Sequence, residues 1–228
     1  MRPTVLLFDI DGTLLSTGGA GRRAIDRAFE LVHGRPDACR HLSFDGMTDR
    51  GIARLGLEAI NIAVDDAAID QLLARYVDCL EAAVQSVPDH QYIVHTGMRE
   101  AIEAGLAAGM AVGLGTGNVR EGARVKLGRV KLFEKFSFGG FGDDHELRPE
   151  LIRSGALRGA QKLGVTLVEA RVVVIGDTPK DVSAAQAIGA ESVGVATGGF
   201  TVDQLRASGA THAFESLAEE GALDVLLR

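Results

Sequence analysis

Short apolar runs separated by helix-like segments set the pattern of this chain. The runs cover residues 5–8, 111–114, 172–175 and 193–196. Continuous apolar runs of this length are typical of strands that are buried on both faces of a parallel sheet. Gly109 and Gly189 stand where helices should end, and Thr201 and Gln204 have the spacing of a helix capping box. The alternation predicts an α/β fold with a doubly wound parallel sheet and helices on both of its faces.

Residues 16–91 follow a different pattern. Their apolar positions recur at helical spacing and predict no convincing strand; the helical segments are 20–33, 49–60 and 66–87. We therefore expect an all-helical cap domain here, inserted after the first strand of a catalytic core formed by residues 1–15 plus 92–228. The glycine-rich stretch 18–21 and the segment 88–97 would connect the two domains.

Composition narrows the class of protein. The 228 residues are 46% hydrophobic and carry a formal net charge of −7, which argues against nucleic-acid binding. No apolar stretch is long enough for a signal peptide or a membrane span. Cys39 and Cys79 lack metal-ligand spacing and are expected to be reduced thiols. We expect a cytoplasmic monomer or homodimer that binds neither nucleic acid nor membrane.

Acidic residues follow two of the apolar runs. Asp9 and Asp11 belong to the sequence Asp-Ile-Asp-Gly-Thr, directly after the first run, and Asp177 follows the third. Asp181 comes one helical turn later, and Pro179 could open that helix so that Asp181 faces back to the strand end. Asp177 could also be a simple helix cap. Two strands that end in acids nevertheless imply one shared carboxylate cluster, which needs a cation, and an all-oxygen site favours Mg²⁺.

A third polar element follows the apolar run at 111–114. Thr116, Gly117 and Asn118 place a hydroxyl and free helix N–H groups where an anion could bind. A dinucleotide-binding glycine fingerprint is the rival interpretation, but Asn118 occupies its third glycine position and the two acidic strand ends would stay unexplained.

These elements, in this order, resemble the haloacid dehalogenase superfamily, and in particular its helical-cap members such as phosphoglycolate phosphatase and beta-phosphoglucomutase. The resemblance covers essentially the whole chain. It implies that Asp9 is the nucleophile that forms an aspartyl-phosphate and that Asp11 is the general acid and base. It further implies that Thr116, with Gly117 and Asn118, holds the phosphoryl oxygens. Mg²⁺ would be bound by Asp9, the Asp11 backbone carbonyl, Asp177 and Asp181.

One position departs from the pattern of the superfamily. A lysine usually precedes the last motif, but no lysine lies between Lys135 and Lys162. Arg148 is the expected substitute, since arginine can clamp a phosphate through two hydrogen bonds. Arg153 and Lys180 are the next candidates if Arg148 is only a surface residue.

The resemblance implies a phosphatase that hydrolyses a small phosphorylated metabolite, such as phosphoglycolate or a sugar phosphate. Asp11 favours phosphoryl transfer over dehalogenation. Because residues 1–125 contain no lysine, a cap lysine that forms a Schiff base is excluded. A sugar-phosphate mutase and a degenerate phosphate-binding protein stay open. Residues 46–50 resemble a cap segment that faces the active site, although Thr48 or Asp49 could equally be a helix N-cap.

Overall fold

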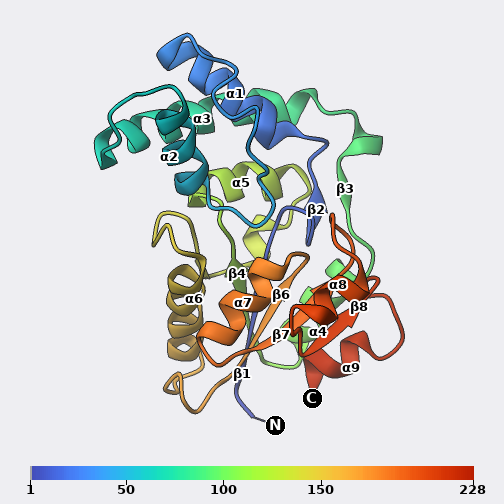
Figure 1. Cartoon of the computed structure of the whole chain (residues 1–228). Helices are drawn as coiled ribbons and strands as arrows, with labels where there is room; N and C mark the ends of the chain where they lie inside the picture. The colour runs from blue at the N-terminus through green and yellow to red at the C-terminus, as the bar shows by residue number, and fades with distance from the viewer. Residues whose placement is uncertain (1) are drawn as a thin grey trace.

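The computed structural model describes residues 2–228 and has a parallel sheet with helices on both faces below a second group of helices (Figure 1). The strands of the sheet are β1 (Thr4–Phe8), β4 (Ala111–Gly115), β5 (Gly139–Gly140), β6 (Arg171–Gly176), β7 (Glu191–Val195) and β8 (His212–Phe214). They lie in the order β5-β4-β1-β6-β7-β8, and every neighbouring pair is parallel. The doubly wound parallel sheet predicted from the apolar runs is therefore confirmed.

The central strand fixes where the functional residues meet. Phe8, the last residue of β1, pairs with Leu114 of β4 on one side and with Ile175 of β6 on the other. The segments that follow these three strands consequently leave the sheet at the same edge, where open α/β sheets bind ligands.

Helices pack on both faces of the sheet because β1 is buried on both. Val5 and Leu7 face one apolar core, and Leu6 and Phe8 face the other. The first face is covered by α6 (Arg148–Lys162) and α7 (Pro179–Ala187), with α8 (Val202–Ala207) beside α7. The second face carries α4 (Met98–Ala107), α5 (Arg120–Arg129) and α9 (Ala222–Leu227).

The remaining helices form the upper group in Figure 1. They are α1 (Ala20–His33), α2 (Asp49–Ala59) and α3 (Asp66–Ser86), where the sequence predicts them. The chain enters and leaves this group through β2 (Leu15–Ser16) and β3 (Ile93–Val94), which pair antiparallel with each other. Two single-turn helices, η1 (Asp89–Gln91) and η2 (Phe133–Lys135), complete the fold. The exact division into cap and core stays a prediction.

Helix ends agree with their sequence signals. Thr201 and Gln204 form a capping box at α8, and Pro179 opens α7. Gly109 and Gly189 adopt positive φ angles of 74° and 71° just after α4 and α7. Among residues 2–228, no helix is long and apolar enough to cross a membrane.

Candidate active site

Three buried carboxylates lie together at the edge of the sheet. Asp9 follows β1, Asp177 follows β6, and Asp181 lies in the first turn of α7. One carboxylate oxygen from each lies within 4.8 Å of the others. We call Asp9, Asp177 and Asp181 the carboxylate cluster. The structure thus brings together the acids that the two strand ends supply, as the sequence predicts.

Local backbone geometry holds Asp177 and Asp181 in place. Gly12 has a φ angle of 79°, and a Cβ atom at this position would collide with the Asp177 carboxylate. Thr13 Oγ1 donates a hydrogen bond of 2.9 Å to Asp177 Oδ1. Thr178, not Asp177, caps α7, because it forms a capping box with Asp181. Asp177 is therefore left free for the carboxylate cluster.

Arg148 is the cation that reaches the carboxylate cluster. It opens α6, is buried, and places Nη2 2.8 Å from Asp9 Oδ2 and 2.6 Å from Asp181 Oδ1. The two other cations considered from the sequence lie elsewhere. Arg153 pairs with Glu150 at 3.6 Å, and Lys180 is exposed.

The carboxylate cluster holds more negative charge than Arg148 can balance. Burial raises the pKa of Asp9 to about 6; Asp181 and Asp11 add to this rise, and Arg148 opposes it. Burial, followed by repulsion from Asp181 and Asp9, raises the pKa of Asp177 to about 8. A divalent cation would remove this conflict, and three carboxylate oxygens are donors that suit Mg²⁺. The Asp11 side chain lies outside this cluster, so Asp11 could contribute only its backbone carbonyl.

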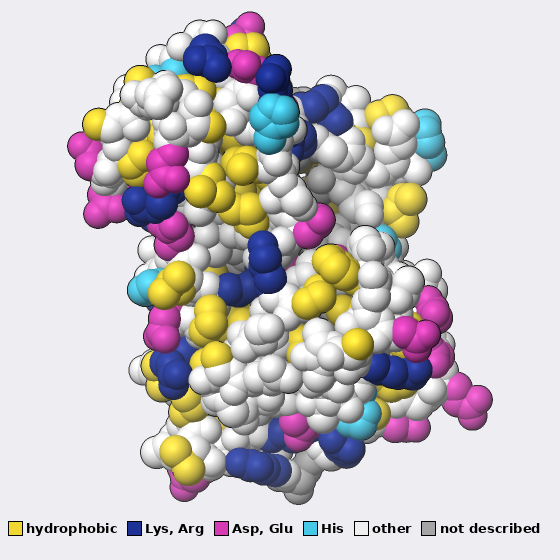
Figure 2. Space-filling model, viewed as in Figure 1, with side chains coloured by type: hydrophobic (Ala, Val, Ile, Leu, Met, Phe, Trp, Pro, Cys, Tyr) yellow, Lys and Arg dark blue, Asp and Glu magenta, His cyan; other side chains and the backbone are white. Residues whose placement is uncertain are grey.

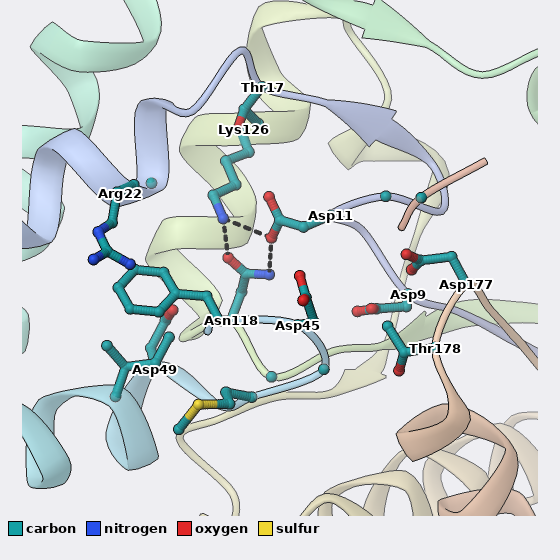
Figure 3. A pocket seen from close by; sticks show the side chains of 18 of the residues that line it. Asp9, Asp11, Thr17, Arg22, Asp45, Asp49, Asn118, Lys126, Asp177 and Thr178 are labelled. Carbon is teal, nitrogen blue, oxygen red and sulfur yellow. Dashed lines mark hydrogen bonds and ion pairs between the residues drawn. The ribbon is translucent and has the colours of Figure 1, made fainter. Parts of the chain in front are cut away.

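A second polar cluster holds the Asp11 side chain. Lys126 Nζ lies 2.6 Å from Asp11 Oδ2 and 2.6 Å from Asn118 Oδ1, and Asn118 Nδ2 donates to Asp11 Oδ2 at 2.8 Å (Figure 3). We call Asp11, Asn118 and Lys126 the lysine cluster. Burial alone would lower the pKa of Lys126, but Asp11 and other nearby groups outweigh it and raise that pKa. Lys126 therefore stays charged beside Asp11.

Lys126 is not among the site residues that the sequence predicts. A signal for it exists, because Val119, Ala123 and Leu127 form the buried stripe of α5 and Lys126 lies within that stripe. A lysine among apolar helix positions needs a partner when it is buried.

Thr116 lies next to Asn118, and its expected role in holding the phosphoryl oxygens stays a prediction. It is fully buried, and its hydroxyl accepts a 2.9 Å hydrogen bond from Asn118 Nδ2. The cavity above the two clusters is lined by Gly117 and Asn118, whereas Thr116 is not among its lining residues. In this structure Thr116 positions Asn118.

A cavity of about 290 Å³ lies between the sheet edge and the upper helices. The core lines it with the two clusters and Arg148, and the upper helices line it with residues of α1, α2 and α3. In Figure 2 the molecule narrows where these two parts meet. Arg22 lines the cavity, but its guanidinium donates to Cys39 O at 2.6 Å and Leu42 O at 2.9 Å. Arg22 therefore stabilises the loop after α1 through these two hydrogen bonds.

Residues 46–50 form the seam between the upper helices and the core. Thr48 is the N-cap of α2, and its neighbours Met47 and Asp49 line the cavity, so both interpretations of this segment hold. Asp49 N donates to Gly117 O at 2.8 Å, and Asp49 Oδ2 accepts from Val119 N at 2.9 Å. A Cβ atom on Gly117 would collide with the Met47 carbonyl, so the two backbones touch.

Comparison with known proteins agrees with this geometry. The haloacid dehalogenase-like hydrolase family matches residues 3–189. A phosphoglycolate phosphatase from Pseudomonas putida is 28% identical over 204 residues, which are 86% of this chain and 70% of that protein. Probable phosphatase IndB from Dickeya dadantii is 26% identical over 237 residues, which cover 100% of this chain and 96% of that protein.

Solved structures share the fold. CbbY from Rhodobacter sphaeroides, crystallised with phosphate, superposes with a TM-score of 0.70 at 18% identity, covering 98% of this chain and 100% of that one. A crystal structure from Clostridium acetobutylicum, described as a predicted phosphatase, has a TM-score of 0.68 at 19% identity, with 99% of each chain covered. Because the family match spans most of the sequence, this chain belongs to the haloacid dehalogenase-like hydrolases.

Proposed function

We propose that this protein is a Mg²⁺-dependent phosphatase that hydrolyses a small phosphomonoester through an aspartyl-phosphate on Asp9. The observation that carries the proposal is the carboxylate cluster with Arg148 at the base of the cavity. The related phosphatases from Pseudomonas putida and Dickeya dadantii support the same activity. The cytoplasmic location expected from the sequence stays a prediction.

The carboxylate cluster fits a resident Mg²⁺ ion. Asp9, Asp177 and Asp181, with the Asp11 backbone carbonyl, would be its protein ligands. When bound, Mg²⁺ supplies charge neutralisation between the Asp9 carboxylate and the negatively charged phosphate.

Asp9 is placed to attack phosphorus. Arg148 holds one of its carboxylate oxygens at 2.8 Å, which fixes the side chain and offsets part of the repulsion from the phosphate. A bond forms between the Asp9 carboxylate and phosphorus as the bond from phosphorus to the ester oxygen breaks. Gly117 and Asn118, on the cavity wall, would contact the phosphoryl oxygens.

Asp11 would move the protons of both steps. Its side chain is 44% exposed and lines the cavity, so it can reach both the ester oxygen and a water molecule. Protonated Asp11 gives its proton to the departing alkoxide. It then takes a proton from the water that attacks the phosphorus of the aspartyl-phosphate, which releases phosphate and restores Asp9.

The test is phosphate release from a panel of phosphomonoesters, with and without Mg²⁺, including phosphoglycolate and hexose phosphates. Metal-dependent release that disappears in Asp9→Asn supports the phosphatase. Conversion of one hexose phosphate isomer into another without phosphate release would identify the mutase. Neither reaction, with folded protein and bound metal, would leave the degenerate phosphate-binding protein.

A further inference from the structure

The side of the cavity that the upper helices supply is largely apolar. Its apolar lining comes from α1, α2 and the segment between them, and consists of Ile25, Phe44, Met47 and Ile52. Ile25 and Ile52 belong to the large buried core, and Phe44 and Met47 pack against that core. The four side chains therefore form one continuous apolar surface that the cavity exposes. We call them the apolar wall.

The apolar wall lies where the leaving group of an ester would lie. Figure 3 shows Asp9 and Asp177 at one side of the pocket and Arg22, which contacts Phe44, at the other. In phosphoryl transfer the attacking and leaving oxygens lie roughly in line across phosphorus. An ester whose phosphoryl group is at Asp9 therefore directs its leaving group away from the carboxylate cluster, toward the upper helices.

Within residues 2–228, the three cationic side chains that line the cavity are already paired. Arg148 contacts two acids of the carboxylate cluster, and Lys126 pairs with Asp11. The guanidinium of Arg22 donates to two backbone carbonyls of the loop after α1, and its Nε lies 3.4 Å from a carboxylate oxygen of Asp26. A carboxylate or a second phosphate on the leaving group would have to displace one of these pairs.

The other lining residues also disfavour a charged or strongly polar leaving group. Asp45 and Asp49 line the cavity, and both would repel a second anion. Sugar hydroxyls would lose water against the apolar wall, whose side chains offer them no hydrogen bond. An apolar leaving group would instead be stabilised by the same contact.

Arg22 shapes the apolar wall. Its guanidinium carbon lies 4.3 Å from the centre of the Phe44 ring, over the ring face, and this cation–π contact holds the ring on the cavity wall. The cavity of about 290 Å³ is at the lower end of the range for ligand pockets, which is about 300–1,000 Å³. The Phe44 ring therefore limits the size of the leaving group that can bind.

We propose that the apolar wall binds the leaving group of the ester, so that the substrate is the monophosphate of a small, uncharged, apolar alcohol. The inference rests on the proposed phosphatase function. It assigns a different substrate class from the hydroxy-acid phosphates and sugar phosphates that the family resemblance suggests. A branched alkyl chain of about five carbons suits a cavity of this size.

Three esters of similar shape test this preference. 3-Methylbutyl phosphate ends in an apolar branch, 3-hydroxybutyl phosphate carries a hydroxyl in place of one methyl group, and 3-phosphonooxypropanoate carries a carboxylate in place of the branch. With Mg²⁺ present, we expect kcat/KM for 3-methylbutyl phosphate to exceed that for 3-hydroxybutyl phosphate about tenfold and that for 3-phosphonooxypropanoate about 100-fold. The polar ends should lose water without gaining partners.

A polar substitution in the apolar wall tests the site itself. Met47→Gln keeps the length of a half-buried side chain, so it should fold. It should lower the preference for 3-methylbutyl phosphate over 3-hydroxybutyl phosphate about fivefold, mainly through KM. Leu55→Gln introduces the same amide on α2, at a side chain that is 38% exposed and does not line the cavity, and should keep the wild-type preference.

Phe44→Ala should enlarge the cavity, and its readout is a gain that unfolding cannot produce. The ratio of kcat/KM for the bulkier 2-phenylethyl phosphate to that for 3-methylbutyl phosphate should rise about tenfold. Phe133→Ala removes a partly buried ring that does not line the cavity, so it should keep the wild-type ratio.

The two proposals fail in different ways. Equal kcat/KM for the three esters, or a preference for 3-phosphonooxypropanoate, would overturn the role of the apolar wall while the phosphatase stands. Equal preferences in Met47→Gln and Leu55→Gln, or equal ratios in Phe44→Ala and Phe133→Ala, would do the same. No phosphate release from any ester would overturn both proposals.

Discussion

The carboxylate cluster and the lysine cluster flank the same cavity but balance their charges differently. Three buried acids of the first face one cation, Arg148, whereas in the second Asp11, Asn118 and Lys126 balance one another. The first cluster is therefore short of positive charge and could take an added cation, whereas the charges of the second are balanced. A step at Asp9 that depends on a metal ion and an Asp11–Lys126 ion pair that does not can thus coexist within one pocket.

Asp9→Asn, in the carboxylate cluster, should cause the largest loss of activity. The amide is a poor nucleophile, so we expect turnover to fall by about 10⁴-fold or more. Asparagine has nearly the same shape and removes one of three crowded carboxylates, so thermal unfolding should still be cooperative. Phosphate release and a melting curve check both points, and wild-type turnover would refute the nucleophile assignment.

Arg148→Ala should lower kcat about 100-fold, because Asp9 then loses its fixed cationic partner. Arg148→Lys should recover part of the rate, since it keeps the charge without the planar guanidinium. Arg153→Ala is the matched control, because among residues 2–228 Arg153 pairs only with Glu150 of the same helix. Equal kinetics for Arg148→Ala and the control would show that Arg148 does not replace the usual lysine, and Arg153 or Lys180 would then be the candidates.

Lys126→Met should disturb the second cluster and leave the first intact. Its length is similar, but Asp11 loses its ion pair, and we expect kcat/KM to fall about tenfold. Mg²⁺ affinity, measured by calorimetry, should stay close to that of the wild type, because Lys126 does not touch the carboxylate cluster. Lys135→Met, at an exposed position, provides the control. A large loss of Mg²⁺ affinity would show that the clusters are not independent.

The effect of pH on stability should be smaller, and the part of it that Mg²⁺ changes should come from the first cluster. The folded pKa of Asp177, about 8, lies above the ordinary value of 3.8. Between these values the unfolded chain has released a proton that the folded chain retains, so the metal-free protein should lose stability as pH rises through this window. Mg²⁺ replaces the proton, so it should raise Tm by only about 1 °C near pH 5.5 and by roughly 5 °C near pH 8.5. A shift that is independent of pH would contradict this.

The sequence predicted the first cluster better than the second for a physical reason. Asp9 and Asp177 follow apolar runs, and parallel strands bring their carboxyl ends to one edge whatever else the chain does. Lys126 meets Asp11 only because α5 packs beneath the upper helices, so its place in the apolar stripe of α5 signals a buried partner but not which residue that partner is. The contact between Thr116 and Asn118 has the same origin, because it depends on which way Asn118 turns.

The strands also divide into those that their own residues reveal and those that they do not. β1, β4, β6 and β7 are apolar enough to be recognised in isolation. β5 consists of Gly139–Gly140, which carries no hydrophobic signal, and the three residues of β8 include a polar histidine. Their pairing follows from the neighbouring strand rather than from their own residues, so the sequence alone did not reveal them.

The seam at Asp49 also governs how often the pocket is open. Two hydrogen bonds, to Gly117 and from Val119, join the upper helices to the loop after β4. At about 1 kcal/mol each, they favour the joined state at this point by about 2 kcal/mol, or roughly 30-fold. Losing both hydrogen bonds would raise the population that is parted here by up to about 30-fold, and the rate of substrate entry with it. We therefore expect the opening of this seam, rather than diffusion, to set the rate at which this enzyme binds its ester. Stopped-flow binding to Asp49→Ala should be faster than to the wild type.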